Sequence, residues 1–175
     1  MANTPINIDA LARDLVRLLA DLAGLHAELS GLAREKLAAM RQADSERIAA
    51  FTAQETAIAE RLAEREGLRR QITRRIAEGL GVARTQADRL RVADLADLLP
   101  EPRRSQLLTA ATGLRQRAEE HQRLQRTNLL VTQEMLKHLS GIMTVMCGGG
   151  PAAESYTRGG RRAQPHTASV FEAVG

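Results

Sequence analysis

The stretch LARDLVRLLADLAGLHAELSGL, residues 11–32, decides the fold. Its leucines recur at alternating steps of four and three residues, at Leu11, Leu15, Leu18, Leu22, Leu25, Leu29 and Leu32. An average step of about 3.5 residues is the heptad spacing of a helix that packs against another helix in a left-handed coiled coil. Asn7 or Asp9 can serve as the N-cap residue, so we expect a helix from there to about Met40.

A second long helix follows, because Asp44 and Ser45 offer a new N-cap and Gly79 and Gly81 offer a stop. Its predicted seam keeps the alternating three-four spacing and comprises Ile48, Phe51, Glu55, Ile58, Leu62, Arg65, Arg69, Ile72 and Ile76. The charged members of this seam are the kind of residues that fix the register of a coiled coil.

Residues 85–99 predict a short helical connection that ends at Pro100 and Pro102. Its expected apolar face comprises Val92, Leu95, Leu98 and Leu99. Ser105 is the expected N-cap of a third long helix. The predicted seam of that helix comprises Leu107, Ala111, Leu114, Ala118, His121, Gln125, Asn128, Thr132, Met135, Leu139, Ile142 and Met146, and its middle is polar.

The C-terminal third of this helix has an apolar stripe wider than one neighbouring helix requires, since Leu129, Leu130, Val131, Leu136 and Met143 flank the seam. Such a stripe is either the core of a three-helix bundle or a docking surface for another protein's helix. Three methionines, whose side chains suit adaptable binding surfaces, fit the second alternative. The sequence alone leaves both open.

After Met146 the periodicity ends in CGGGPAAESYTRGGRRAQPHTASVFEAVG. We therefore expect a helical coiled-coil domain at residues 1–146 and a disordered, Gly/Arg-rich tail at residues 147–175. The fold class is all-α: an elongated antiparallel bundle or coiled coil of three long helices with a flexible C-terminal tail. An aromatic content of 2% fits helices better than sheets. The leucine seam fits pairing within one chain, and it also fits a parallel homodimer.

The net charge of +4 is spread along the chain. The basic stretch EREGLRRQITRR, residues 64–75, has acids close by, which favours a solvated helix surface over a phosphate-binding stripe. The N-terminus carries no secretory signal, and charged residues interrupt the most apolar segment, so we expect a cytoplasmic protein that does not insert into membranes. The single Cys147 is consistent with a reducing compartment.

No catalytic or metal-binding motif is recognisable, so we expect neither an enzyme nor a cofactor. His26, His121, His138 and His166 are scattered along the chain. We interpret His26 as a partly buried interface residue, because it borders the leucine seam. His121 follows Glu119 and Glu120, and we interpret it as their neighbour on the helix surface.

Taken together, the leucine-heptad first helix, the second helix with AIAERLAEREGLRRQI, the segment QRTNLLVTQEMLKHLSGIM and the tail SYTRGG resemble the FlgN family of flagellar export chaperones. The resemblance implies a cytoplasmic chaperone of the flagellar type III export system. Such chaperones bind the C-terminal helices of the hook–filament junction proteins FlgK and FlgL, keep them unpolymerised and deliver them to the export gate.

The resemblance also implies roles for particular residues. The client-binding positions are Leu129, Leu136, Leu139, Ile142, Met143 and Met146. Tyr156, with Gly159 beside it, corresponds to the tail tyrosine that contacts the cytosolic domain of the export gate protein FlhA. The resemblance assigns no role to the cluster of Arg158, Arg161 and Arg162.

The sequence leaves two alternatives open, and the second belongs to another class of protein. The first is a generic coiled-coil adaptor or another type III secretion chaperone with a different client. The second is a basic protein that binds nucleic acid through Arg158, Arg161 and Arg162, which predicts strongly salt-dependent binding. Interleaved acids and the lack of an aromatic stacking platform count against nucleic acid as a partner.

Overall fold

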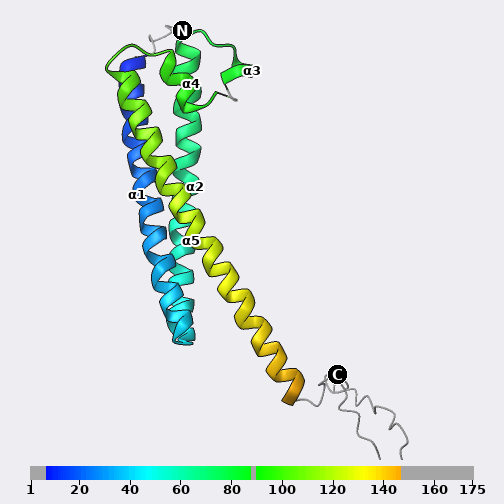
Figure 1. Ribbon diagram of the computed structural model, residues 1–175. Helices are drawn as coiled ribbons and strands as arrows, with labels where there is room; N and C mark the ends of the chain where they lie inside the picture. The colour runs from blue at the N-terminus through cyan, green and yellow to red at the C-terminus, as the bar shows by residue number, and fades with distance from the viewer. Residues whose placement is uncertain (1–6, 88–89, 147–175) are drawn as a thin grey trace, which may run out of the picture. The chain divides into compact units, whose positions relative to one another are not determined.

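The computed structural model describes residues 7–87 and 90–146. Their elements are α1 (Ile8–Arg41), α2 (Ser45–Gly79), α3 (Arg84–Ala87), α4 (Val92–Asp97) and α5 (Arg103–Met146) (Figure 1). The described residues contain helices and no strand, which confirms the all-α fold class. Contacts divide the chain into one unit that ends at Thr132 and a second that begins at Gln133. The predicted tail, residues 147–175, lies outside the described residues.

Local capping accounts for the first two helices. The side chain of Asn7 accepts a hydrogen bond from the backbone N–H of Ala10, and that of Asp44 accepts one from Arg47, each at 3.0 Å. These bonds satisfy N–H groups that have no partner within their own helix. The predicted starts of both helices are therefore confirmed. Gly81, with φ of 79°, follows the end of α2 in the left-handed conformation that glycine adopts readily.

The third long helix begins three residues earlier than a helix capped by Ser105 would begin. α5 begins at Arg103, and the carbonyl of Pro100 accepts from the N–H of Arg103 at 3.0 Å. Ser105 is therefore inside the first turn and is not the N-cap. Its hydroxyl donates to the carbonyl of Pro102, while the carboxylate of Glu101 accepts from its N–H. A glutamate ahead of the helix thus takes the role expected of a serine.

α1 and α2 form an antiparallel hairpin that turns at residues 42–44. Lys36 pairs with Glu55 near this turn at 2.7 Å, and Glu28 pairs with Arg61 farther from it at 3.7 Å. Arg65 is exposed, and the partly buried Glu66 takes its place in the seam, where it bonds Arg69 at 2.9 Å. The sequence predicted a three-residue step from Leu62 to Arg65. That prediction was wrong, because a four-residue step leads from Leu62 to Glu66.

Within the first unit, α5 runs parallel to α1 (Figure 1). Five contacts join them: Asp9 with Arg103, His26 with His121, Ala33 with Asn128, Met40 with Thr132, and Arg34 with Glu120. The first four pairs are separated by 92 to 95 residues in the chain, whereas the long side chains of Arg34 and Glu120 meet across a separation of 86 residues. A nearly constant separation means that the two helices advance together in register.

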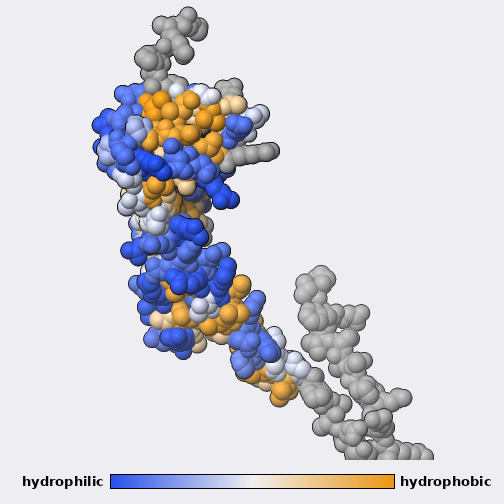
Figure 2. Space-filling view, turned by 45° about the horizontal axis from the view of Figure 1, so that its top comes forward, coloured by the Kyte–Doolittle hydropathy of each residue, from blue (hydrophilic) through white to orange (hydrophobic). Residues whose placement is uncertain are grey.

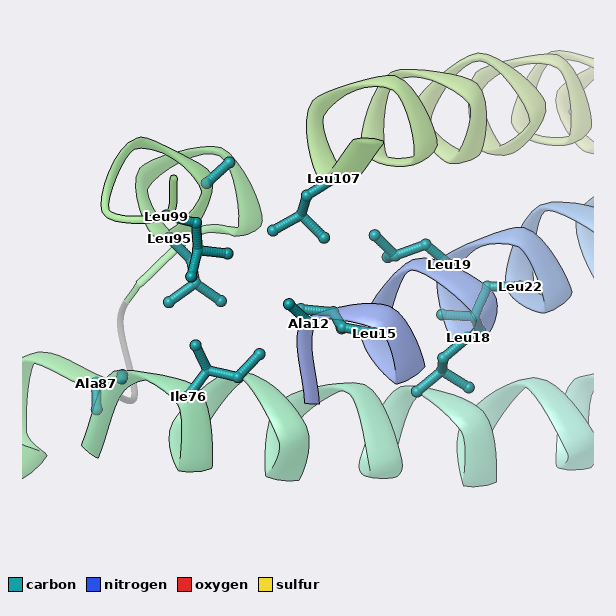
Figure 3. Packing of buried hydrophobic residues seen from close by; sticks show 12 residues of the cluster. Ala12, Leu15, Leu18, Leu19, Leu22, Ile76, Ala87, Leu95, Leu99 and Leu107 are labelled. Atoms are coloured by element: carbon teal, nitrogen blue, oxygen red, sulfur yellow. The ribbon is translucent and has the colours of Figure 1, made fainter. Parts of the chain in front are cut away.

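The hydrophobic core is concentrated at the end of the hairpin opposite its turn (Figure 3). Its fully buried leucines on α1 confirm the predicted seam, and Leu95 of α4 and Leu99, just after that helix, cover the end of the core. Leu98 was predicted to lie on the same face but is exposed, because the helical spacing ends at Asp97 and the chain then turns so that Leu99, and not Leu98, reaches the core. The buried side chains of this cluster are Ala12, Leu15, Leu18, Leu19, Leu22, Ile76, Ala77, Ala87, Leu95, Ala96, Leu99 and Leu107.

Polar side chains fill the interface farther along α5. His121 and Gln125 contact each other at 3.1 Å, and Gln125 donates to Glu55, the partner of Lys36. The amide of Asn128 donates to the carbonyl of Ala33 at 2.9 Å. The polar middle of the predicted α5 seam is therefore an internal hydrogen-bonded layer. His121 belongs to it and is partly buried, so its interpretation as a surface neighbour of two glutamates was wrong.

Candidate binding face at the end of the last helix

The turns of α5 around and beyond residue 129 carry large apolar side chains that are more than half exposed. Figure 2 shows apolar atoms gathered on the last described part of this helix. The set comprises Leu129, Leu130, Leu136, Leu139, Ile142, Met143, Val145 and Met146. Their exposed fractions run from 55% to 81%, well above those of the core leucines. We call this set the apolar face.

The spacing of the apolar face continues the seam that packs inside the bundle. Asn128 is buried and Thr132 is partly buried, and steps of three and four residues lead on to Leu139, Ile142 and Met146. Residues that far apart lie on one side of a helix. Within the first unit, the contact of Thr132 with Met40 lies next to the end of α1. The second unit carries the same spacing with exposed side chains.

All six predicted client-binding residues belong to the apolar face and are exposed. Of the three methionines, Met135 is partly buried, whereas Met143 and Met146 are exposed. Leu130 and Val145 also belong to the face, although the predicted set omits them. The sequence placed Leu130 in the wide apolar stripe beside the seam, whereas it gave no signal for Val145 beyond its apolar side chain.

Two predicted residues of another kind, Tyr156 and Gly159, lie outside the described residues, as do the three tail arginines. Within residues 7–87 and 90–146, no three His, Cys, Asp or Glu side chains are arranged to hold a metal ion. None of the helices described combines the length and hydropathy that crossing a bilayer demands.

A helical bundle with an exposed apolar helix face defines the class: a protein built to bind another protein, such as a chaperone or an adaptor. The family model described as FlgN protein matches residues 10–164. The chain therefore belongs to the FlgN family, and this membership makes it a chaperone of flagellar type III export. The match confirms the resemblance seen in the sequence. No curated protein and no solved structure matches the chain.

Proposed function

We propose that the apolar face binds the amphipathic C-terminal helices of the hook–filament junction proteins FlgK and FlgL in the cytoplasm. The observation that supports this proposal is the exposure of eight large apolar side chains on one stretch of α5. A monomer in water rarely leaves so many large apolar residues exposed together, unless the surface has a partner. An amphipathic client helix supplies the complementary apolar stripe.

Binding of this kind keeps the client unpolymerised without any covalent chemistry. The client's apolar helical stripe, covered by the chaperone, is not available to other client molecules. The methionines of the face have flexible, polarisable side chains that adapt to more than one client surface. This property fits a chaperone that serves both FlgK and FlgL.

The test is isothermal titration of the full chain with peptides that span the C-terminal helices of FlgK and FlgL. Leu139→Asp and Ile142→Asp each place a charge in the middle of the face, and we expect binding to weaken about 30-fold or more. Thr144→Asp is the matched control, because Thr144 is exposed on the same turns but is not part of the apolar face. If both Leu139→Asp and Ile142→Asp bound the peptides as tightly as the wild type, the apolar face would not be the client-binding site.

Self-association competes with this proposal, because a second copy of the chain could cover the same face. Light scattering of the wild type and of Leu139→Asp decides between the two. We expect the same mass for both proteins. A dimer that the substitution dissociates would assign the face to a homodimer instead.

We propose further that the tail delivers the complex by docking Tyr156 and Gly159 on the cytosolic domain of FlhA. The family match supports this role because it extends to residue 164 and so includes both positions. A tyrosine supplies a large contact area with few rotatable bonds. Tyr156→Ala is expected to retain FlgK and FlgL binding while losing affinity for the FlhA domain. Equal FlhA affinity in variant and wild type would contradict this role.

A further inference from the structure

A cavity of about 290 Å³ lies beside the C-terminal half of α2, where the chain passes through α3. The described residues that line it are Arg69, Arg70, Thr73, Arg74, Ala87 and Leu90. Three of these lining residues are arginines, and no described lining residue is acidic. This cavity lies in the first unit and shares no residue with the apolar face.

The hydroxyl of Thr73 is the unusual feature of this cavity. The Thr73 side chain is 3% exposed, and its Oγ1 atom is buried without a hydrogen-bond partner. Six other helical threonines donate to the carbonyl four residues earlier, namely Thr52, Thr56, Thr109, Thr127, Thr132 and Thr144. Thr73 does not use that local acceptor. A buried hydroxyl without a partner is costly unless a ligand supplies one.

Two of the arginines that line the same cavity, Arg69 and Arg70, have N–H groups beyond those that their Nε atoms donate. Arg69 Nε donates to the Glu66 carboxylate at 2.9 Å, which fixes the position of the guanidinium. Its Nη groups then remain as donors for a ligand. Arg70 Nε makes a long bond of 3.4 Å to the backbone carbonyl of Glu66. The planar fork of a guanidinium matches the paired oxygens of a phosphate group, and Thr73 adds a short hydroxyl donor.

We propose that this cavity binds a small oxyanion, namely a phosphoryl group held by Arg69, Arg70 and the hydroxyl of Thr73. The basic stretch at residues 64–75 is therefore more than a solvated surface. The burial of Thr73 beside the arginines distinguishes this place from the rest of that stretch. The site is separate from the client-binding proposal, and either can fail without the other.

The probe is inorganic phosphate, compared with chloride at equal ionic strength, and the readout is the melting temperature of the full chain. A ligand that binds only the folded state raises the melting temperature, by about 3–5 °C at tenfold excess over Kd. Adenosine monophosphate forms the second arm. A larger rise with the nucleotide assigns the phosphoryl group to nucleotides, and a larger rise with phosphate assigns it to the free anion.

Matched variants separate a site from general charge effects. Thr73→Val keeps the shape but removes the unpaired hydroxyl, so it should melt at or above the wild-type temperature without ligand and lose the phosphate-induced rise. Thr73→Ser should retain the rise. Arg70→Gln should lose it, whereas Arg65→Gln, the loss of an exposed arginine on the same helix, should keep it. Two results would overturn the proposal. One is that phosphate does not raise the melting temperature of the wild type. The other is that it raises the melting temperatures of Thr73→Val and Arg70→Gln as much as that of the wild type.

Discussion

The Nδ1 atoms of His26 on α1 and His121 on α5 lie 3.4 Å apart. Two ring nitrogens at this distance share at most one proton, so the contact requires at least one of the two to be deprotonated. Burial lowers the pKa of both histidines, and the charge of His121 lowers the pKa of His26 further. Glu66 beside His26 and Glu55 beside His121 act in the opposite direction but more weakly.

The histidine contact makes the stability of the bundle depend on pH. Because the folded pKa values lie below the unfolded value of 6.5, the unfolded chain binds more protons as the solution becomes acidic. The stabilisation is complete above about pH 7 and declines as the pH falls through about 6.5 towards the folded pKa values. We expect a lower urea midpoint at about pH 5 than at about pH 7.5.

The variant His26→Gln/His121→Gln should flatten this pH dependence. Asp9 does not interfere, because its hydrogen bond from Arg103 lowers its pKa below the ordinary 3.8, so its contribution is lost only in more acidic solution. If the double variant kept the wild-type difference between the two urea midpoints, other groups would be responsible.

Leu22→Ala should destabilise the protein strongly. Leu22 is fully buried in the core cluster, so truncation removes apolar contacts and leaves a cavity that the surrounding helices fill only in part. The expected cost is about 2–5 kcal/mol in urea unfolding. Leu68→Ala is the matched control on α2, since Leu68 is 43% exposed and should cost below about 1 kcal/mol. Similar costs for both leucines would mean that the core lies elsewhere.

The long helices could be predicted from the sequence because repeated apolar spacing and capping residues are local signals. Asn7, Asp44 and the leucines of residues 11–32 marked the first hairpin correctly. The start of α5 was missed because Ser105 fits the N-cap pattern, whereas Glu101 acts from outside the helix. Arg65 was wrongly assigned to the seam of α2. The partner helix decides whether three or four residues separate one seam position from the next, and the sequence of α2 alone does not show this.

Contacts between helices were harder to predict. His121 follows two glutamates, so its neighbours in sequence indicate a surface, and only the packing of α5 on α1 brings it to His26. The exposure of Leu139 and Ile142 also could not be derived from spacing, because core and binding faces share the same pattern. Thr73 gave no sequence signal, since its significance depends on the missing partner of its hydroxyl.

Asn128→Ala should cost about 1–3 kcal/mol. Asn128 is 5% exposed, and its amide donates to the carbonyl of Ala33, so the substitution removes a buried hydrogen bond between α5 and α1 and leaves a small void. Thr127→Ala, on the exposed neighbour, is the control and should change the urea midpoint little. An Asn128→Ala variant as stable as the control would show that the bond adds nothing to the parallel register.

Lys36 and Glu55 provide a test of how a largely buried ion pair acts in this bundle. Their side chains are 15% and 13% exposed and meet at 2.7 Å, and Gln125 also reaches Glu55. Lys36→Met leaves the carboxylate without its cation in a poorly solvated place, so we expect a loss of about 1–3 kcal/mol at neutral pH. The double variant Lys36→Met/Glu55→Met replaces both charges with flexible apolar side chains and should recover most of that loss. Urea unfolding of the two single variants and the double variant completes the cycle. A double variant that is destabilised by the sum of the two single losses would show that the two residues act independently, and that the pair does not connect α1 to α2.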